Sequence, residues 1–391
     1  MPHDRQAMTA ASRLLERFRH ARAATQALAA RLGAEDMQAQ SMPDASPVKW
    51  HLAHTAWFFE TFLLSPRLPG YRVFDEAFGY LFNSYYEAVG ARHPRAERGL
   101  ITRPTAARVL EWRAHVDEAM ERLIPRLDEA GAALVELGVA HEEQHQELIL
   151  MDALHLFSRS PLKPAFFEGD PPRASSTAPM EFKGHPGGLA QVGHGGECFA
   201  FDNEGPRHTV YLQPFAIADR LVTNGEWIDF IEDGGYRAAA LWLADGWAMA
   251  QVEGWQAPLY WRQEGGQWLA LTLHGDRPVD PHALVSHVSY YEADAYAAWA
   301  GKRLATEAEW EQAPLMGRLW QWTRSAYLAH PGFRPGPGAV GEYNGKFMVS
   351  QMVLKGGSHA SPAGHARATY RNFFYPQQRW MFSGVRLADD A

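Results

Sequence analysis

The chain has 391 residues, of which 46% are hydrophobic and 21% charged, a balance typical of a folded globular protein rather than a disordered one. Its formal net charge of −8 argues against a general nucleic-acid binder, which needs a basic face. No apolar run approaches the roughly 18 residues of a membrane-spanning helix, and one cysteine, Cys198, excludes an internal disulfide and fits a reducing cytoplasm. We therefore expect a cytoplasmic protein of two domains, each of roughly 150 to 200 residues.

The first half of the chain is predicted to be helical. Apolar residues recur at helical spacing from about Thr9 to Leu32, which predicts an amphipathic helix of the fold rather than a targeting segment. A second helix follows, with Ser46 as expected N-cap and Pro47 as first helical residue. Further helices are predicted from Pro104 to Ile124 and over the apolar run Leu137 to Leu156. Four helices joined by turns and one long crossover predict a four-helix bundle, whose core often holds metal ligands.

The fourth helix, expected to begin after Gly131, carries the sequence HEEQHQE from His141 to Glu147. Histidines four residues apart lie one above the other on a helix, so His141 and His145 can bind one ion. Such spacing is common by accident, so taken alone it is more typical of two partly buried histidines satisfied by hydrogen bonds. In the second helix, either His51 or His54 can reach a metal shared with this pair. For His54, we favour the interpretation that it is an interior histidine hydrogen-bonded to a carbonyl oxygen.

The segment between the second and third helices, Pro66 to Gly99, lacks periodicity but is rich in aromatic residues. Long irregular loops with so much apolar surface are usually functional. Within it, the tyrosines of Leu81–Tyr86 are followed by Arg92, Arg95 and Arg98. Phenols next to guanidinium groups indicate a proton donor beside an anion clamp. A core tyrosine pair with a solvated basic turn fits this stretch equally well.

The second half of the chain differs in composition. Six prolines between Arg159 and Gly188 are typical of a linker, after which short, glycine-punctuated, tryptophan-rich pieces follow. Clear helical stretches are limited to Thr223–Ile231 and Ser289–Trp299, so we expect a loop-rich α+β fold. The expected organisation is a helical bundle in residues 1–160, a proline-rich linker in 161–188 and a second domain in 189–391.

Six blocks spread over nearly the whole chain resemble the ergothioneine-biosynthesis sulfoxide synthases. In order, they are Met42–His54 (MPDASPVKWHLAH), Leu81–Tyr86 (LFNSYY), His141–Leu148 (HEEQHQEL), Gly301–Trp310 (GKRLATEAEW), Gly341–Met348 (GEYNGKFM) and Thr369–Phe374 (TYRNFF) with its continuation to Leu387.

The resemblance implies an N-terminal DinB-like four-helix bundle followed by a formylglycine-generating-enzyme-like domain of C-type-lectin type. Members of the family bind one non-haem Fe(II) through three histidines, matched here by His51, His141 and His145, and use O2 as co-substrate. His54 falls outside this set. A three-histidine face leaves open positions on iron for O2 and for a sulfur or selenium ligand.

The implied substrate is hercynine (Nα-trimethylhistidine), which receives the new bond at its imidazole C2. Gln144 matches the family position that hydrogen-bonds this imidazole. Tyr85 and Tyr86 match the active-site tyrosines of one branch, without indicating which of them faces the iron. Arg92 and Arg95 lie where the family clamps the carboxylate of its thiol substrate. The C-terminal domain is expected to contribute three substrate-binding residues, namely Asn372, Phe373 and Phe374, the phenylalanines facing the trimethylammonium group.

Two departures from the family lie in the C-terminal domain. The chain between Trp310 and Leu319 is shorter than usual, and His359 replaces a usual cysteine. A closely similar branch, the selenoneine synthases, shares the iron site and hercynine but takes selenium from a selenosugar. The altered segment slightly favours C–Se bond formation. In contrast, Arg92, Arg95 and Arg98 favour a thiol donor with a carboxylate, cysteine or γ-glutamylcysteine, and a sulfoxide product, because a neutral sugar needs no carboxylate clamp.

An alternative from another class is a zinc-dependent DinB-type thiol S-transferase. It would use the same three histidines with Zn²⁺ activating a thiol, and would need neither the tyrosine pair nor the second domain. A formylglycine-generating oxidase needs a pair of reactive cysteines, which Cys198 alone cannot supply.

Overall fold

The structure, a computed structural model, describes residues 10–171 and 178–391 and divides the chain into two units. The helical unit contains the chain up to Leu156 together with Gly338–Glu342, and the mixed unit contains Phe157–Pro337 and Tyr343–Ala391. Thr9, the expected start of the first helix, and residues 172–177 of the expected linker lie outside the described residues.

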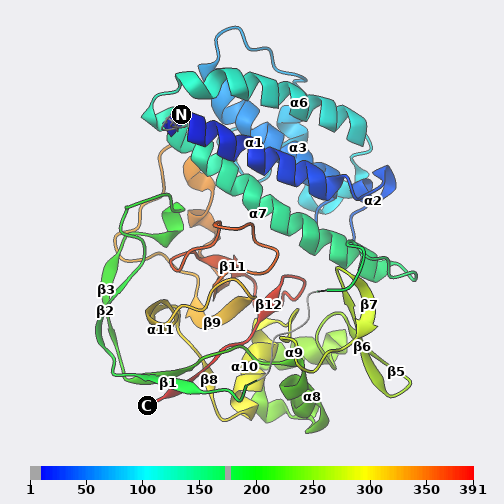
Figure 1. Ribbon diagram of the computed structural model, residues 1–391, viewed down its shortest axis with the longest axis vertical. Helices are drawn as coiled ribbons and strands as arrows, with labels where there is room; N and C mark the ends of the chain where they lie inside the picture. Colours follow the sequence, from blue (N-terminus) through cyan, green and yellow to red (C-terminus); the bar gives the residue numbers. More distant parts are fainter. Residues whose placement is uncertain (1–9, 172–177) are drawn as a thin grey trace, which may run out of the picture. The chain divides into compact units, whose positions relative to one another are not determined.

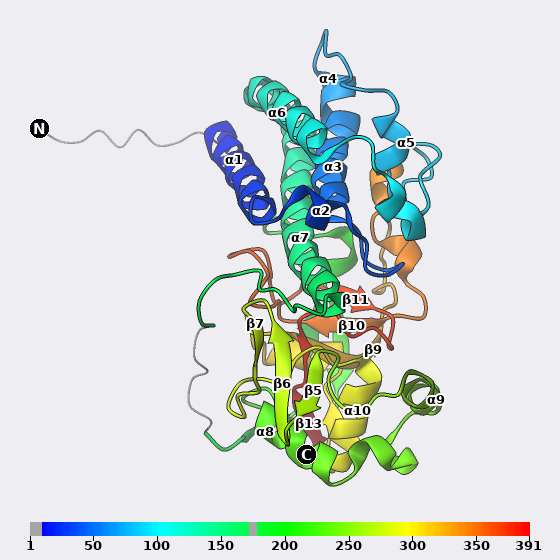
Figure 2. The same cartoon turned by 90° about the vertical axis from the view of Figure 1, so that its right-hand side faces the viewer.

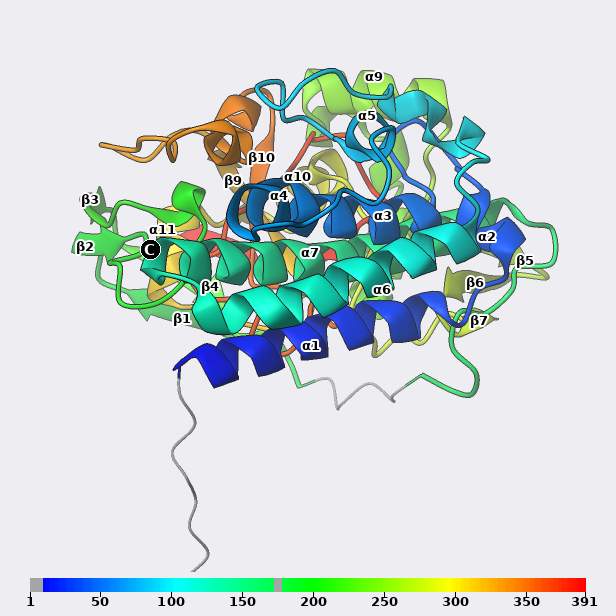
Figure 3. The same cartoon turned by 90° about the horizontal axis from the view of Figure 1, so that it is seen from above.

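Four long helices form the helical unit, as predicted (Figure 1). Seen from above, they run alongside one another (Figure 3). They are α1 (Ala10–Ala29), α3 (Val48–Phe59), α6 (Ala106–Leu123) and α7 (Glu129–Arg159). Shorter segments connect them, including α2 (Ala34–Gln38), a π-helical turn η1 (Glu60–Leu64), α4 (Ser65–Arg67), α5 (Phe78–Phe82), and the 3-10 turns η2 (Arg95–Leu100) and η3 (Ile124–Arg126).

Some helix ends differ from the predictions. Helix α3 begins at Val48 with Pro47 as its N-cap, one residue later than expected, and Ser46 instead donates its backbone N–H to Asp152 Oδ2 at 2.8 Å. Helix α7 begins at Glu129, before Gly131, so this glycine lies within the helix rather than before it. Ser46 does not cap the helix because it binds Asp152, which lies more than a hundred positions away in the chain. A local capping rule cannot detect such a partner.

Gly138 marks a close approach between α3 and α7. A Cβ atom at this position would lie 2.6 Å from Phe59 Cε1 and 2.8 Å from Phe58 Cε1. Such distances are shorter than van der Waals contact, so only glycine lets the rings of α3 pack against α7 here. The Phe58 ring also contacts His141, with centroids 5.0 Å apart, and therefore this crossing point bears on the position of that histidine.

The mixed unit is built from two four-stranded sheets, a β2–β3 hairpin and a three-stranded β5–β6–β7 ribbon. Figure 1 shows the hairpin and Figure 2 shows the ribbon. One sheet has the order β1-β4-β13-β8 and the other β11-β10-β9-β12. The strands are β1 (Phe182–His185), β2 (Gly188–Val192), β3 (His208–Leu212), β4 (Phe215–Ala218), β5 (Trp261–Glu264), β6 (Gln267–Thr272), β7 (Gly275–Pro278), β8 (Arg303–Leu304), β9 (Trp320–Ala326), β10 (Met352–Lys355), β11 (Asn372–Phe374), β12 (Ser383–Gly384) and β13 (Leu387–Asp390).

Four helices accompany these strands. They are α8 (Asn224–Glu232), α9 (Ala244–Glu253), α10 (Tyr290–Trp299) and α11 (Glu307–Gln312). Helices α8 and α10 were predicted, and each has a capping box, centred on Thr223 and Ser289, that satisfies its first free N–H groups. Helices α9 and α11 were not predicted. None of the described helices combines the length and apolar character needed to cross a membrane.

Candidate metal centre

Three buried histidines of the helical unit come together between α3 and α7. His54 lies on α3 and His141 and His145 lie on α7, and one ring nitrogen from each lies within 4.8 Å of the other two. Among the histidine, cysteine and carboxylate side chains of residues 10–171 and 178–391, these three histidines converge closely enough to hold a metal ion.

The orientation of His54 is fixed by aromatic packing and one hydrogen bond. Its ring stacks on Trp50, at a centroid distance of 4.6 Å, and on Trp57, at 5.5 Å. Its Nδ1 donates to the carbonyl oxygen of Phe82 at 2.7 Å. Because the proton is on Nδ1, Nε2 carries the lone pair, and this buried atom has no hydrogen-bond partner in the described part of the chain. The carbonyl contact expected for His54 is present, and it prepares the other nitrogen for a ligand.

The geometry of His141 and His145 also suits a metal. Their Nε2 atoms are 3.1 Å apart. Two nitrogens bound at right angles to one ion, each about 2.1 Å from it, would be about 3.0 Å apart. Burial lowers the pKa of His141 to about 3 and the pKa values of His54 and His145 well below the usual range, so all three imidazoles are neutral near pH 7. Neutral, convergent imidazoles fit a transition-metal ion such as Fe(II).

His51, the third ligand expected from the resemblance, has a different environment. It lies on the same face of α3 as His54, but both of its ring nitrogens are engaged. Nδ1 lies 2.7 Å from Nδ1 of His145, and Nε2 lies 3.0 Å from Oδ2 of Asp152. The structure thus brings a ring nitrogen of His54 together with those of His141 and His145, whereas the two ring nitrogens of His51 face His145 and Asp152. The sequence could not distinguish them, because positions three apart on a helix share a face.

A buried group of charges lies behind His141. Glu142 accepts hydrogen bonds from Arg22 of α1 at 2.8 Å and from Arg113 of α6 at 2.7 Å. Burial alone would raise the pKa of Glu142, but the two guanidinium groups outweigh it and hold the value at about 2. Arg113 also donates to Thr55 of α3, so the network ties all four long helices together at the level of the histidines.

The predicted tyrosines lie in the turn that follows α5. Tyr86 is buried and Tyr85 is partly exposed. The ring of Tyr86 lies 5.4 Å from that of Trp57, which itself stacks on His54, so Tyr86 is one ring removed from the histidine cluster. Asn83 stabilises this turn by donating to the Tyr86 carbonyl at 3.1 Å and accepting from its N–H at 3.2 Å.

A residue that the sequence did not indicate also holds this turn. Glu342, in the 3-10 turn Ala339–Glu342, accepts hydrogen bonds from the backbone N–H groups of Glu87, at 3.1 Å, and Ala88, at 2.9 Å. A segment more than 250 residues away in the chain thereby fixes the backbone just after Tyr86, a contact that no local pattern reveals.

The other predicted residues of the helical unit have mixed environments. Gln144 lies on α7, half-buried and next to His145. Arg92 is exposed and pairs with Glu87 at 2.8 Å, and Arg95 is exposed and donates to the carbonyl oxygen of Asp44. Neither arginine is buried in the histidine cluster. Arg98 is buried instead, with its guanidinium carbon 3.4 Å from the centre of the Trp50 ring.

Asn372, Phe373 and Phe374 form strand β11 of the mixed unit. The Phe373 ring stacks on Tyr327 at a centroid distance of 4.1 Å, and Phe374 contacts Trp380 edge-on at 5.6 Å. All three side chains are half-buried. They are therefore fixed by packing within the mixed unit while keeping part of their surface exposed.

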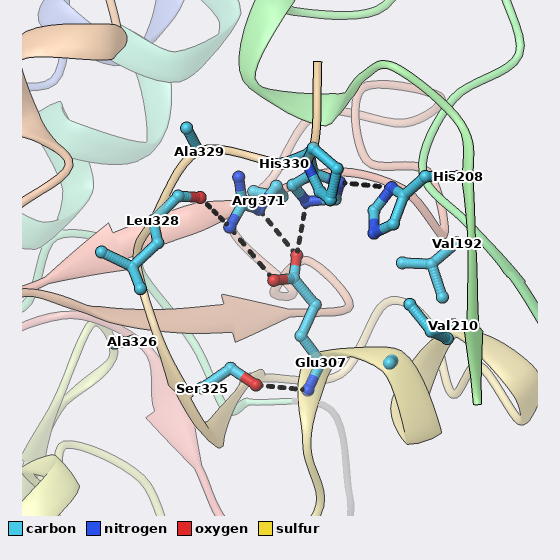
Figure 4. Close-up of a pocket in the computed structure, with 12 residues that line it drawn as sticks. Val192, His208, Val210, Glu307, Ser325, Ala326, Leu328, Ala329, His330 and Arg371 are labelled. Atoms are coloured by element: carbon cyan, nitrogen blue, oxygen red, sulfur yellow. Dashed lines mark hydrogen bonds and ion pairs between the residues drawn. The ribbon is translucent and has the colours of Figure 1, made fainter. Parts of the chain in front are cut away.

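The mixed unit also contains a cavity of about 320 Å³ that is lined by apolar side chains and by a group of polar and charged ones (Figure 4). Arg371 binds the carboxylate of Glu307 through two hydrogen bonds of 2.7 and 3.1 Å, and His330 Nε2 lies 3.8 Å from the same carboxylate. His330 Nδ1 lies 3.3 Å from His208 Nδ1. Burial alone would raise the pKa of Glu307, but Arg371, His330 and Lys355 hold it far below its usual range. This ion pair joins the blocks Gly301–Trp310 and Thr369–Phe374.

Comparisons with known proteins agree with this two-part architecture. The family model of the DinB superfamily matches residues 17–149. The model described as a sulfatase-modifying factor enzyme 1-like domain matches residues 172–317 and 313–391. The predicted fold class, a DinB-like helical region followed by a formylglycine-generating-enzyme-like domain, is thereby confirmed.

Two relatives match over nearly the full length of the chain, and a third matches over about a third of it. The chain is 32% identical to hercynine oxygenase of Mycolicibacterium thermoresistibile, over 91% of this chain and 90% of that protein. It is 33% identical to hercynine oxygenase of Mycobacterium tuberculosis, over 89% of this chain and 92% of that protein. A formylglycine-generating enzyme of Streptomyces coelicolor is 38% identical, over 35% of this chain and 48% of that protein.

Proposed function

The chain belongs to the hercynine oxygenase family, and we propose that it uses Fe(II) and O2 to join a chalcogen atom to C2 of the imidazole ring of hercynine. The observation that carries this proposal is the convergence of His54, His141 and His145. These three residues would hold the iron, with His54 in place of the His51 expected from the sequence.

Iron held by three neutral imidazoles supplies open positions for O2 and for a sulfur or selenium donor, and thereby the oxidising chemistry of the reaction. The residues around it have separate tasks. Gln144, next to His145, hydrogen-bonds the imidazole of hercynine and orients it. Trp50 and Trp57, which stack on His54, keep water away from the cluster. Asn372, Phe373 and Phe374 remain our candidates for hercynine contacts, to be tested by the effect of their substitution on KM for hercynine.

Tyr86 is our candidate proton donor, because it is the buried member of the tyrosine pair and contacts Trp57. General acid catalysis contributes about 10²–10⁴-fold to a rate, so Tyr86→Phe should lower product formation by about 100-fold or more. Iron binding should be unchanged, since only a hydroxyl is removed. Tyr85→Phe is the matched control and should have the smaller effect. Loss of iron from Tyr86→Phe would show that the residue is structural.

The finer proposal concerns the donor, for which we slightly favour a selenosugar and C–Se bond formation. The two sequence departures behind this preference are joined in the structure. His359 donates its backbone N–H to the carbonyl oxygen of Arg318 at 3.0 Å, and Gly317 donates to that of Gly356 at 2.8 Å. The shortened segment and the altered Gly356–His359 segment thus lie against each other in the mixed unit. Arg92 would favour a thiol donor with a carboxylate only if it released Glu87 and bound the carboxylate of the donor instead.

A competition experiment tests both levels of the proposal. The iron-loaded enzyme is given hercynine and O2 with an equimolar mixture of cysteine, γ-glutamylcysteine and a selenosugar, and the products are identified by mass. A selenium-containing product supports the finer proposal. A sulfoxide formed from cysteine or γ-glutamylcysteine contradicts it while supporting the general one. Hercynine recovered unchanged with every donor contradicts both.

A further inference from the structure

His51 is the one histidine near the metal centre for which the three-histidine site provides no role. Its side chain is only 3% exposed, and both of its ring nitrogens have partners. On one side it meets His145, a proposed ligand, and on the other it meets Asp152, which lies seven positions further along α7 and is also buried. A buried carboxylate, an imidazole and a metal ligand therefore lie in one hydrogen-bonded line.

The chemistry of these three groups fixes where the protons lie. An ionised carboxylate only accepts hydrogen bonds, so Nε2 of His51 must carry the proton that bridges the 3.0 Å to Asp152 Oδ2. In a neutral imidazole the other nitrogen is then an acceptor, and Nδ1 of His51 accepts across 2.7 Å from Nδ1 of His145. His145 consequently carries its proton on Nδ1. Its lone pair is on Nε2, the atom that lies 3.1 Å from Nε2 of His141.

Asp152 is itself held in place. Its Oδ2 atom accepts a second hydrogen bond, of 2.8 Å, from the backbone N–H of Ser46, just before α3. The carboxylate therefore binds two groups of the α3 segment, one from the backbone and one from a side chain. This dual contact fixes α3 and α7 relative to each other at the level of His145.

We propose that Asp152 and His51 are positioning residues that select the tautomer of His145 and aim its Nε2 at the metal. The inference rests on the proposed function, because it takes His145 to be a ligand. His54 offers an internal comparison, since its tautomer is selected by a neutral carbonyl, that of Phe82. In contrast, His145 is linked through His51 to a negative charge. Such a link strengthens a histidine as a ligand, and losing a partner of this kind typically costs about 10–100-fold in metal affinity.

The proposal differs sharply from the assignment of His51 as a ligand. A ligand must offer a lone pair to the ion, and an amide in its place would replace a nitrogen donor by a weaker oxygen donor and change the Co(II) spectrum. A positioning residue needs only an acceptor opposite Nδ1–H of His145, which the amide oxygen of glutamine can supply. The pair His51→Gln and His51→Leu therefore separates the two roles, because leucine fills similar space without an acceptor.

The test uses the full-length protein and Co(II), whose visible absorption reports ligand number and geometry, together with Fe(II) titration. We expect His51→Leu to bind both ions about 10–100-fold more weakly than wild type, and His51→Gln to stay within a few fold of wild type with a wild-type Co(II) spectrum. Asp152→Asn should also weaken binding. The double variant His51→Leu/Asp152→Asn should be no weaker than His51→Leu alone, since both act through His145. His155→Leu, which removes a histidine bonded to Ser41 elsewhere on α7, is the matched control and should bind normally.

Two results would overturn the inference. One is a His51→Gln variant as weak as His51→Leu, with a Co(II) spectrum that has lost a nitrogen ligand. The other is a His51→Leu variant that binds as wild type does. Circular dichroism of the metal-free variants identifies any that do not fold, and His51→Gln and Asp152→Asn keep the test decisive in that case. Wild-type protein that binds Co(II) with the expected dependence on His51, yet consumes no O2 with hercynine, contradicts the proposed function and leaves this inference standing.

Discussion

Two parts of the molecule bring histidines together, with opposite results. In the helical unit, the Nε2 atoms of His141 and His145 lie 3.1 Å apart, and a ring nitrogen of His54 converges with those of this pair. In the mixed unit, His208 and His330 lie 3.3 Å apart beside the cavity, but His330 turns its other nitrogen toward Glu307, which Arg371 already binds. In the helical unit, the lone pairs of the histidines face a common point. In the mixed unit, the charged groups beside the histidines are already paired with one another. Convergent lone pairs, rather than proximity of histidines, distinguish a metal centre from a structural network.

The largest effect should come from removing a ligand of the first cluster. His54→Ala should lose iron, and O2 consumption with hercynine should fall by more than the roughly 100-fold typical of losing an outer partner. The readouts are metal content and oxygen uptake. His208→Ala is the control from the mixed unit and should keep its iron. Full iron content in His54→Ala would restore His51 as the third ligand.

The next effect concerns the stability of the mixed unit. Glu307→Ala leaves the buried guanidinium of Arg371 without its carboxylate. Breaking a buried pair by removing one partner costs about 3–5 kcal/mol, so denaturant unfolding should show a loss of that size. The folded variant should still bind iron. A loss below about 1 kcal/mol would mean that the network around the cavity is not a structural element.

A smaller effect is expected at the helix crossing behind the metal centre. In Gly138→Ala, the new Cβ would meet Phe58 and Phe59 at less than 3 Å. Overpacking of this kind typically costs about 1–3 kcal/mol, measured as the free energy of unfolding. Gly79→Ala is a suitable control, because it lies in helix α5 with open space at its Cβ position, and it should be neutral or slightly stabilising. Equal effects from the two substitutions would contradict the close approach at Gly138.

The last expected effect is a pH dependence of the metal-free protein, which builds up gradually as the pH falls. Burial lowers the pKa of His141 to about 3, whereas the unfolded chain titrates it near 6.5. Above about pH 6.5 both states are neutral at this residue, and below it only the unfolded state binds the proton. Stability should therefore fall as the pH falls from 6.5 toward 3, by about 1.4 kcal/mol per pH unit for this residue. His141→Gln should flatten the unfolding profile by that slope, and an unchanged slope would contradict the assignment.

Much of the fold follows from local sequence signals. The long helices have clear periodicity, and Thr223 and Ser289 begin helices α8 and α10 through capping boxes. Helix α11 has the same signal at Thr306 and Glu309, so it could have been found. Helix α9 begins at Ala244 after the N-cap residue Leu243, which provides no side-chain cap, and three of its residues are alanines, so neither periodicity nor capping indicated it.

The site was predictable only in part. Residues His141 and His145 follow from their spacing on one helix, but the choice between His51 and His54 depends on partners far away in the chain. Phe82 lies 28 positions from His54, and Asp152 lies 101 positions from His51. These contacts decide which ring nitrogen is left for a metal, and only the packed helices reveal them. The same limit applies to Glu342, which binds the backbone of the tyrosine turn from a position more than 250 residues further along the chain.

The most direct test of the proposed function is metal analysis of the purified wild-type protein combined with oxygen uptake in the presence of hercynine and a chalcogen donor. We predict one iron per chain and O2 consumption that depends on hercynine. Stoichiometric zinc that supports thiol transfer without O2 consumption would contradict the proposal and favour a zinc-dependent thiol S-transferase built on the same three histidines.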